Sequence, residues 1–457
     1  MKSIWKRMLC ACCALAAAFS LTACAEGDSA YKIAQKNGYA GDEKAWLLSL
    51  KGEKGEDGKD VDVEAVYEAA KANGYEGDFL AFLKEYFSLT VNEDNNTRQI
   101  AENMTSVLSI HCGFSKIVYT FQGTYRQYYQ TAGSGVILEM DGDTGSALIV
   151  TNYHVLYDSA SESTTGISDC IYLYPYGSLF DFSPTENFYG DGIEATYVGG
   201  AMDYDIALLR VENSEYLKAN KDVLRAAEIG DSERIVAGEK VYAIGNPEGA
   251  GISVTSGAIS VESEYITMKS TDGNEYVSYR VMRTDAAING GNSGGALFDA
   301  NGKLIGITNA KNVAEETDNV GFALPITQVR YLCDNILENG TGYAKCAVLG
   351  SEISVKTSAA KFDDEGHLRI EEVLYVTSAT KVATSADYGK FRTLDVLEWI
   401  KIGDGEICYL TREYLLYDQL LRVRKDDTVT FGVRDADGVL TEVEISFTTN
   451  AHFKAYR

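Results

Sequence analysis

The second half of the chain contains the stretch Thr284-Asp-Ala-Ala-Ile-Asn-Gly-Gly291-Asn-Ser293-Gly-Gly-Ala-Leu297. Glycine adopts backbone conformations that other residues avoid, so we expect a tight turn in which the N–H groups of Gly291 and Ser293 converge and the Ser293 hydroxyl projects beside them. Acyl transfer needs two such donors aimed at the developing oxyanion. The stretch therefore predicts a nucleophilic Ser293 and an oxyanion hole formed by the amides of Gly291 and Ser293. The alternative is a plain glycine turn.

A seryl hydroxyl becomes a good nucleophile only when a neighbouring base removes its proton. The stretch Ala147-Leu-Ile-Val-Thr-Asn-Tyr-His154 ends an apolar strand at one of only four histidines in the chain. Taken alone, His154 is as well explained as a half-buried histidine with satisfied hydrogen bonds. The rival base on the N-terminal side, His111, has no comparable motif around it. We therefore predict that His154 is the general base.

The base must be held in one tautomer by a buried carboxylate. The stretch Asp203-Tyr-Asp205-Ile-Ala-Leu-Leu209 supplies a carboxylate directly before a buried strand. Asp205 alone could equally cap that strand or form a salt bridge. The order His154, Asp205, Ser293 is an unlikely coincidence, and it predicts a catalytic triad.

Short apolar or alternating runs recur from about Met104 onward, with turn signals between them. Many short strands at such spacing are typical of an antiparallel sandwich or barrel. Asn213–Arg225 is the predicted connection between two halves. Residues 347–449 form another unit with strand runs, a helix-like Thr411–Leu421 and a final hairpin between Thr428–Val433 and Thr441–Phe447. The sequence predicts a mainly β protein.

The three motifs, in this order, resemble the HtrA (DegP-like) branch of the trypsin-like serine proteases. The similarity covers roughly residues 104–338. The resemblance implies two six-stranded antiparallel barrels within residues 96–340, with His154 and Asp205 from the first barrel, Ser293 from the second, and the triad in the cleft between them. Further motifs of this branch are Gly133-Ser-Gly-Val136-Ile, Ala243-Ile-Gly-Asn246-Pro, Val254-Thr-Ser-Gly257, Gly302-Lys-Leu-Ile-Gly306-Ile and Gly321-Phe-Ala-Leu-Pro325-Ile.

Residues 347–457 resemble the PDZ domain, an α+β unit, that follows the protease in this branch. Val348-Leu349-Gly350 is similar to the start of its peptide-carboxylate loop, and Thr393-Leu-Asp395-Val-Leu397 to the strand that usually reads Gly-Asp-x-Ile. Leu394 stands where the branch has glycine. A PDZ groove captures a chain end by adding it to a sheet edge, and this departure leaves peptide binding open.

The residue six positions before the nucleophile lies at the base of the primary pocket in trypsin-like folds, and here it is Ala287, followed by Ile288. The resemblance places Ile307, Thr308 and Asn309 on the other wall of the pocket. None of these residues offers a carboxylate to pair with Lys or Arg. We therefore expect cleavage after small or medium aliphatic residues such as Val, Ala or Leu.

The first residues form an export signal. Basic Lys2, Lys6 and Arg7 precede an apolar run that is too short to span a bilayer and ends in Leu21-Thr-Ala-Cys24. This end is similar to a bacterial lipobox, in which the cysteine is diacylated after residues 1–23 are removed. An ordinary secretory signal is the alternative. We expect an extracytoplasmic protein held at the outer face of the cell membrane by a lipid on Cys24.

Residues 24–95 contain a repeat whose copies begin at Tyr31 and Tyr67, with three Gly-X-Y triplets between them. Each copy reads as a helix, an Asn-Gly turn, an Asp cap and a second helix. We interpret this segment as a lipid-anchored helical spacer that lifts the main domain off the membrane. A binding role is the alternative.

Charge and cysteine content exclude several classes of partner. The formal net charge of −26 makes nucleic acid an unsuitable partner, because phosphates would be repelled. Of nine cysteines, three lie in the signal and Cys24 carries lipid, which leaves five that are widely spaced and have no C-x-x-C pattern. This argues against a disulfide framework and a zinc site, so we interpret them as small buried side chains. The predicted chemistry needs no metal or cofactor.

Taken together, the sequence predicts a serine endopeptidase that degrades or processes misfolded or exported polypeptides at the cell surface. A protease that is also a chaperone would look the same in sequence. The alternative, from a different functional class, is a non-catalytic surface protein that binds other molecules as an adhesin or holdase and has a protease-like scaffold. The aromatic-rich loop Ser115–Thr131 is a candidate contact surface for the homotrimer that the branch commonly forms, or else a hairpin face packing on itself.

Overall fold

The computed structural model describes residues 93–178, 182–183, 185, 188–249, 251–309, 320–340 and 342–456, together with Lys71. The predicted signal, the lipobox Cys24 and nearly all of the repeat lie outside the described residues. The described part begins with helix α6 (Glu93–Met104) and, Lys71 aside, belongs to one compact unit, Val91–Arg457. Within the described ranges, each helix is too short or too polar to cross a membrane.

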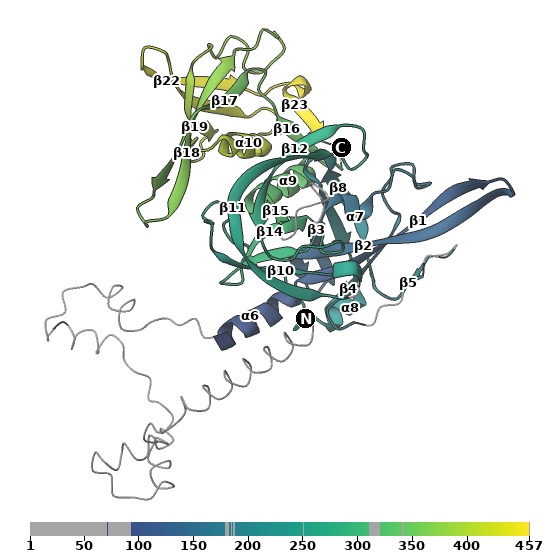
Figure 1. The fold of residues 1–457 in the computed structure, drawn as a ribbon. Coiled ribbons are helices and arrows are strands. Elements are labelled where there is room, and N and C mark those ends of the chain that lie inside the picture. The colour runs from purple at the N-terminus through teal and green to yellow at the C-terminus, as the bar shows by residue number, and fades with distance from the viewer. Residues whose placement is uncertain are drawn as a thin grey trace, which may run out of the picture. The chain divides into compact units, whose positions relative to one another are not determined.

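Apolar runs of the first half pair into a seven-stranded antiparallel sheet in the order β7-β4-β1-β2-β3-β9-β8 (Figure 1). This confirms the mainly β fold, and it fits the six-stranded first barrel that the resemblance implies. Only Ala195 separates β7 from β8, and its N–H donates to the carbonyl of Ile171 on β4 at 3.0 Å. The continuous segment Ile193–Ala201 therefore pairs with β4 through β7 and with β9 through β8, and joins the two ends of the sheet. The strands are β1 (Val107–Thr120), β2 (Gly123–Asp141), β3 (Ser146–Thr151), β4 (Cys170–Pro175), β7 (Ile193–Glu194), β8 (Thr196–Ala201) and β9 (Ile206–Val211), with helix α7 (Tyr153–Leu156), the 3-10 turn η1 (Met202–Tyr204) and a separate short pair, β5 (Phe182–Ser183) and β6 (Tyr189–Gly190).

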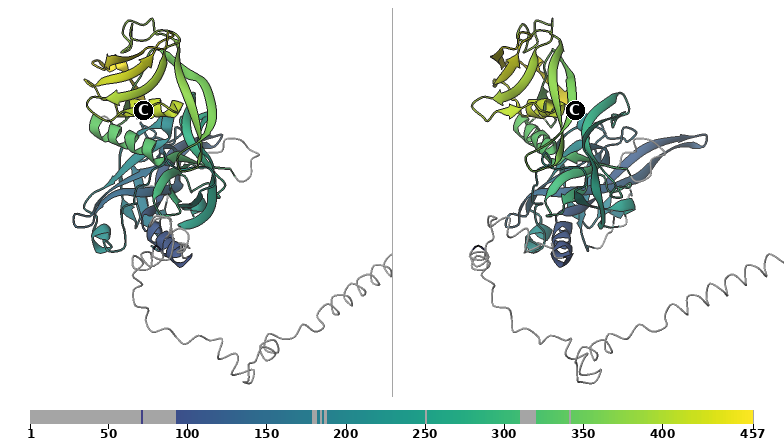
Figure 2. Two further views of the ribbon diagram at one scale, coloured as in Figure 1. Left: turned by 90° about the vertical axis from the view of Figure 1, so that its left-hand side faces the viewer. Right: turned by 60° about the vertical axis from the view of Figure 1, so that its left-hand side comes forward.

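The aromatic-rich segment 115–131 forms the outer half of a long hairpin. Strands β1 and β2 pair in unbroken register along its length, and the β-branched and aromatic residues there suit paired strands. The hairpin projects from the sheet in Figure 1 and Figure 2, and leaves Tyr119 and Phe121 81% and 96% exposed. The segment is therefore a hairpin, but the aromatic side chains at its tip are exposed and do not pack on it. A role in trimer assembly stays a prediction.

The second half closes into a six-stranded antiparallel barrel in the order β10-β11-β12-β15-β14-β13, and β10 pairs with β13 to complete the circle. This is the second barrel that the resemblance implies. Helix α8 (Glu215–Ala219) lies within the predicted connection Asn213–Arg225. The barrel strands are β10 (Lys240–Gly245), β11 (Ser253–Lys269), β12 (Tyr276–Thr284), β13 (Ala296–Asp299), β14 (Leu304–Asn309) and β15 (Gly321–Pro325), with the 3-10 turn η2 (Pro247–Gly249) after β10.

Helix α9 (Ile326–Asn339) leads from the barrel to an α+β unit with its own apolar core. Helix α10 (Glu413–Arg422) lies within two residues of the predicted helix, and β21 pairs with β22 as the predicted final hairpin. The sheet runs β17-β18-β19-β21-β22 with β20 beside β19, and β16 pairs with the last strand, β23. The strands are β16 (Ala344–Ala347), β17 (Glu352–Phe362), β18 (Leu368–Ser378), β19 (Val396–Ile402), β20 (Cys408–Tyr409), β21 (Thr428–Arg434), β22 (Leu440–Ser446) and β23 (Phe453–Tyr456), with the turn η3 (Asn450–His452).

A buried ion cluster joins the barrel to helix α10. The Arg280 side chain on β12 is 1% exposed, and its guanidinium lies 2.6 Å from Asp418 Oδ2 and 3.0 Å from Glu233 Oε1. The guanidinium also lies 3.5 Å from the ring centre of Tyr414, and Gln328 Nε2 donates to Asp418 Oδ1 at 3.0 Å. Burial raises the pKa of Asp418 to about 6. This carboxylate therefore depends on Arg280 to stay charged.

The substitution Arg280→Met should destabilise the protein by about 3–5 kcal/mol, because it leaves the buried Asp418 carboxylate without its cation. The double variant Arg280→Met/Asp418→Asn should recover much of this loss, since no unpaired buried charge remains. Urea unfolding of the full chain measures both free energies. Equal losses in the single and double variants would mean that Arg280 acts through packing alone.

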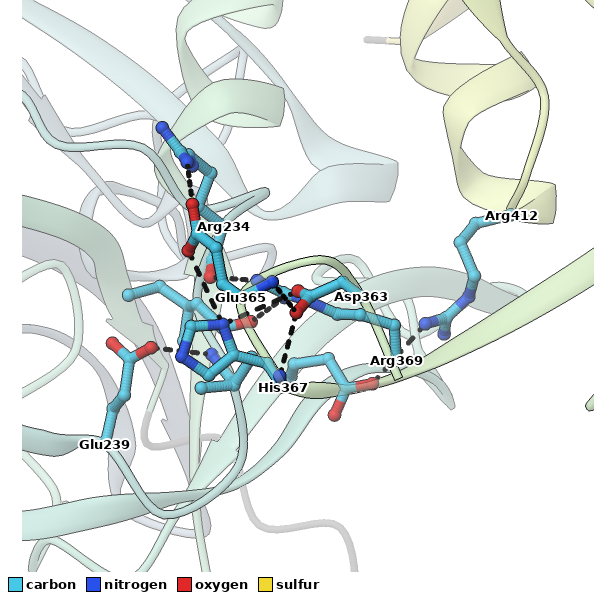
Figure 3. A network of polar contacts seen from close by, with 10 residues as sticks. Arg234, Glu239, Asp363, Glu365, His367, Arg369 and Arg412 are labelled. Atoms are coloured by element: carbon cyan, nitrogen blue, oxygen red, sulfur yellow. Dashed lines mark hydrogen bonds and ion pairs between the residues drawn. The ribbon is translucent and has the colours of Figure 1, made fainter. Parts of the chain in front are cut away.

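A second set of polar contacts ties the β17–β18 hairpin to the loop that precedes β10 (Figure 3). Arg369 donates to the backbone carbonyls of Ile235 at 2.8 Å and Arg234 at 2.6 Å, and its Nε lies 3.1 Å from Asp363 Oδ2. Arg234 also pairs with Glu365 at 3.2 Å, with both side chains exposed. Because exposed ion pairs contribute little, the carbonyl contacts of Arg369 are the main polar link at this hairpin.

Candidate active site

The strand registers explain why residues far apart in the sequence meet at one edge of the first sheet. Thr151, the last residue of β3, pairs with Ala207 of β9. His154 follows β3 and Asp205 precedes β9, so antiparallel pairing brings the two side by side. In the barrel, the start of β13 pairs with β14, which places the glycine-rich loop before β13 next to the end of β14.

His154 and Asp205 meet at two points. Asp205 Oδ2 lies 2.6 Å from His154 Nδ1, and Asp205 Oδ1 accepts the backbone N–H of His154 at 3.0 Å. The Asp205 side chain is 1% exposed and that of His154 is 24% exposed. Because a carboxylate can only accept, Nδ1 carries the proton and Nε2 is left as the basic nitrogen. The pair thus has the geometry of a base and its orienting acid.

The backbone at Asp205 lies at φ 55°, in the left-handed region that residues other than glycine use sparsely. Its carbonyl accepts from Asn152 Nδ2 at 2.9 Å and from the N–H of Tyr153 at 3.1 Å. These bonds hold the conformation that points the carboxylate at His154.

The loop that carries Ser293 takes a turn that requires glycine. Gly291 and Gly294 have φ angles of 92° and 80°, where a side chain would be strained. The N–H of Gly294 donates to the carbonyl of Thr308 at 2.9 Å, and Thr308 Oγ1 donates to the carbonyl of Asn292 at 2.6 Å. Ser293 itself is 4% exposed. The loop is therefore a fixed part of the barrel.

Ser134 on β2 is a residue of the site to which the sequence analysis gave no role. Its N–H donates to the carbonyl of Ser293 and its hydroxyl donates to the carbonyl of Gly291, both at 2.8 Å. The Ser134 side chain is fully buried. The motif Gly133-Ser-Gly-Val136-Ile contains Ser134 and is the only sequence signal that would have drawn attention to it.

Asn309 contacts Asp205 of the predicted triad, whereas the resemblance implies that Asn309 forms a wall of the substrate pocket. Its Nδ2 donates to Asp205 Oδ2 at 3.0 Å and contacts the Tyr279 hydroxyl at 3.3 Å. Thr271 Oγ1 lies 3.4 Å from Asp205 Oδ1. Neighbouring residues of a strand point to opposite faces, so Thr308 holds the Ser293 loop while Asn309 holds Asp205. Two adjacent residues of β14 therefore tie the nucleophile loop to the aspartate.

The other residues expected around the pocket differ in exposure. Ala287 is exposed, and its carbonyl accepts from Thr255 Oγ1 at 3.0 Å. Ile288 is partly buried against the barrel core, and Ile307 and Thr308 are fully buried. Ile307 belongs to the apolar core. The specificity prediction therefore rests mainly on Ala287 and Ile288.

The rival base His111 lies in a buried polar cluster. Its Nε2 is 3.0 Å from Ser109 Oγ, which also contacts Asn246 Nδ2. Burial lowers the pKa of His111 to about 4, so this imidazole stays neutral at physiological pH. His111 has the surroundings of a structural histidine.

The cysteines of the described residues include three buried side chains, Cys112, Cys333 and Cys346. Burial raises the pKa of each of these thiols, which makes them unreactive. Cys170 and Cys408 are partly exposed. The interpretation as small buried side chains fits the first three best.

The C-terminal loop expected to hold a peptide carboxylate already holds a carboxylate of the chain. The N–H groups of Gly350 and Ser351 donate to Asp387 Oδ1 and Oδ2 at 2.8 and 2.9 Å, and Asp387 is 1% exposed. An N–H directed at one acceptor is not open to another, so these two amides are occupied. A cavity of about 320 Å³ adjoins the loop and is lined mostly by apolar side chains, among them Leu349, Ile353, Leu416, Tyr417 and Leu420.

Comparison with known proteins shows that the chain is similar to serine proteases. A model of the trypsin-like peptidase domain matches residues 133–307. The serine protease Do-like HtrA of Lactococcus lactis is 32% identical over 332 residues, which cover 70% of this chain and 71% of that protein.

Two further relatives match a smaller part of their own length. The serine protease Do-like HtrB of Bacillus subtilis is 36% identical over 209 residues, which cover 45% of this chain and 39% of that protein. The periplasmic serine endoprotease DegP of Escherichia coli is 33% identical over 268 residues, which cover 58% of this chain and 48% of that protein. The chain thus spans less than half the length of these two relatives.

Proposed function

Because the chain belongs to the HtrA family of serine proteases, we propose that it is a serine endopeptidase with Ser293 as nucleophile. The observation that carries the proposal is the contact of 2.6 Å between His154 Nδ1 and the buried Asp205 carboxylate. An imidazole held in one tautomer in this way is what a seryl nucleophile needs. The glycine turn around Ser293 supports the second requirement, because the positive φ angles of Gly291 and Gly294 suit a tight turn in which the amides of Gly291 and Ser293 can converge.

The proposed reaction passes through an acyl-enzyme. The Ser293 hydroxyl attacks the scissile carbonyl while its proton passes to His154 Nε2, and Asp205 stabilises the imidazolium that forms. The backbone N–H groups of Gly291 and Ser293 donate to the oxyanion of the tetrahedral intermediate. His154 then gives the proton to the leaving amine. A water molecule, activated by His154, releases the acyl group.

The full chain should degrade a reduced and unfolded protein and leave the same protein intact when it is folded. Ser293→Ala should abolish the degradation, because the variant keeps the fold but lacks the nucleophile. Gel electrophoresis of timed digests measures the effect. Degradation by the variant at the wild-type rate would show that Ser293 is not the nucleophile.

We infer that the substrates are unfolded or exported polypeptides outside the cytoplasm. One relative is named a periplasmic enzyme, and the N-terminal sequence reads as an export signal ending at Cys24. A lipid on Cys24 would hold the protease at the outer face of the cell membrane, with residues 24–95 as spacer. A homotrimer is part of this proposal, and light scattering of the purified chain measures it.

We expect cleavage mainly after Val, Ala or Leu, because the predicted base of the pocket is Ala287 and no carboxylate is placed there for Lys or Arg. A pocket of this kind separates aliphatic residues from one another only by about 10–200-fold, so several of them should be accepted. Mass spectrometry of a peptide-library digest identifies the cut sites, with Ser293→Ala as the blank. Cuts chiefly after Arg or Lys would contradict the expectation.

We propose that residues 347–457 form a PDZ-like domain that does not depend on a free chain end for binding. Asp387 occupies two amides of the loop that would receive a terminal carboxylate, and its negative charge repels another one. A fluorescent peptide with a free C-terminus should therefore bind no better than its C-terminal amide. Anisotropy with Ser293→Ala, which leaves the peptides uncut, measures both. Much tighter binding of the free acid would contradict the proposal.

A further inference from the structure

We infer that Ser134 is the positioning residue of the oxyanion hole, an inference that rests on the proposed function of the Ser293 loop. Ser134 belongs to β2 of the first sheet, whereas the loop belongs to the barrel. Its N–H donates to the carbonyl of Ser293 at 2.8 Å and its hydroxyl donates to the carbonyl of Gly291 at 2.8 Å. One residue thus holds the carbonyls of both residues whose amides would face the oxyanion.

Ser134 is itself held from two sides. Its hydroxyl oxygen accepts the N–H of Asn246, at the end of β10, at 2.8 Å. A hydroxyl has a single proton, so with this lone pair engaged the proton is directed at Gly291. The carbonyl of Ser134 accepts from Thr151 Oγ1 at 2.6 Å. The hydrogen bonds therefore leave neither the Ser134 hydroxyl nor its backbone free to turn.

The loop needs an external hold of this kind. Gly291 lies at φ 92° and has no side chain that would restrict the rotation of its peptide groups. An oxyanion hole works because its donors are aimed before the charge develops. A backbone that could rotate at Gly291 would lose that advantage whenever an amide N–H turned away from the oxyanion. The two carbonyls that Ser134 holds belong to the peptide groups Gly291–Asn292 and Ser293–Gly294, each of which directly follows a residue whose amide would face the oxyanion. Ser134 therefore fixes the backbone on the far side of both residues and limits the directions in which their N–H groups can point.

The test compares Ser134→Ala with Ser168→Ala in the full chain. Ser168 is a matched control, because it is a serine 4% exposed whose hydroxyl contacts the carbonyls of Gly113 and Cys170 at 2.8 and 2.9 Å. We expect Ser134→Ala to lower kcat by about 10–100-fold, somewhat less than the loss of a whole oxyanion donor, with KM unchanged within about twofold. Ser168→Ala should keep the wild-type kcat.

A pair of inhibitors separates positioning from general damage. A peptide ending in valine aldehyde forms a tetrahedral adduct on Ser293 whose oxygen resembles the oxyanion of the transition state. The same peptide ending in a carboxamide stays trigonal and depends much less on the oxyanion hole. Ser134→Ala should weaken the aldehyde by the same factor as kcat and leave the carboxamide unchanged. Equal weakening of both, or a kcat no lower than that of Ser168→Ala, would overturn the inference.

The variant Ser134→Cys distinguishes a loss of positioning from a folding defect. Cysteine fills nearly the same space as serine but is a poor hydrogen-bond donor, so this variant should show the same selective loss of kcat and aldehyde affinity. Wild-type kcat and aldehyde affinity in that variant would overturn the inference. A wild-type chain that neither cleaves peptides nor binds the aldehyde would overturn the proposed function, and this inference with it.

Discussion

Asp205→Asn should lower kcat by about 10⁴ at neutral pH with little change in KM. The amide would present a donor or a neutral acceptor to His154 Nδ1, so the imidazole would lose its fixed tautomer and the stabilisation of its cation. The contact at stake is the 2.6 Å one between Nδ1 and Oδ2. Initial rates on a peptide substrate measure the effect, and circular dichroism checks that the fold is kept.

The matched control is Asp203→Asn, two residues earlier. Asp203 pairs with Lys454 at 3.1 Å, and its side chain is 17% exposed. This variant also removes one carboxylate charge from the same turn, but it leaves the contact with His154 in place. Its kcat should stay within a few-fold of wild type. A similar loss in both variants would mean that the charge of the turn, and not the orientation of His154, sets the rate.

Gly294→Ala should also cost activity, by about 10² or more in kcat. A Cβ on Gly294 would lie 2.2 Å from the carbonyl oxygen of Ser134 and 2.3 Å from Thr151 Oγ1, and the residue has φ 80°. Both neighbours belong to strands of the first sheet, so the loop has to move instead. A displacement of about 1 Å at a reacting group is enough for a loss of this size.

Gly290→Ala is the control for this prediction. A Cβ at Gly290 would meet no heavy atom within 4 Å, although the residue is in the same loop. Kinetics on the same substrate should give a kcat within a few-fold of wild type. If Gly290→Ala lowered kcat as much as Gly294→Ala does, the contact of the loop with the first sheet would not be what positions Ser293.

The contact between His154 and Asp205 and the glycine turn around Ser293 could be predicted because their signals are local. His154 follows an apolar strand, Asp205 precedes another, and Ser293 lies among glycines that a tight turn requires. Each motif can therefore be recognised from a stretch of about ten residues. The pairing of β3 with β9 then follows from their apolar character, and it brings His154 to Asp205. The mainly β fold and the helix before the last hairpin were predictable for the same reason.

The supporting residues could not be predicted, because each depends on a partner far away in the sequence. Ser134 and Gly291 are 157 residues apart, Asn309 and Asp205 are 104 apart, and Arg280 and Asp418 are 138 apart. Ser, Asn and Arg are ordinary surface residues by composition. Only the register of the strands shows which of them are buried, and against what.

The contact of the Asp387 carboxylate with the predicted peptide-carboxylate loop could not be predicted for the same reason. Val348-Leu349-Gly350 has a recognisable pattern. The amides of Gly350 and Ser351, however, donate to Asp387, which lies 36 residues beyond Ser351. The length of the β1–β2 hairpin was also missed, because a run of exposed aromatics has no buried face to mark it as strand.

Covalent labelling by a fluorophosphonate tests the central claim, an assembled triad at Ser293, most directly. The probe reacts only with a serine that a neighbouring base has activated. The full-length wild type should be labelled, mass spectrometry should place the adduct on Ser293, and Ser293→Ala should not be labelled. Equal labelling of wild type and Ser293→Ala, or an adduct on another serine, would contradict the account.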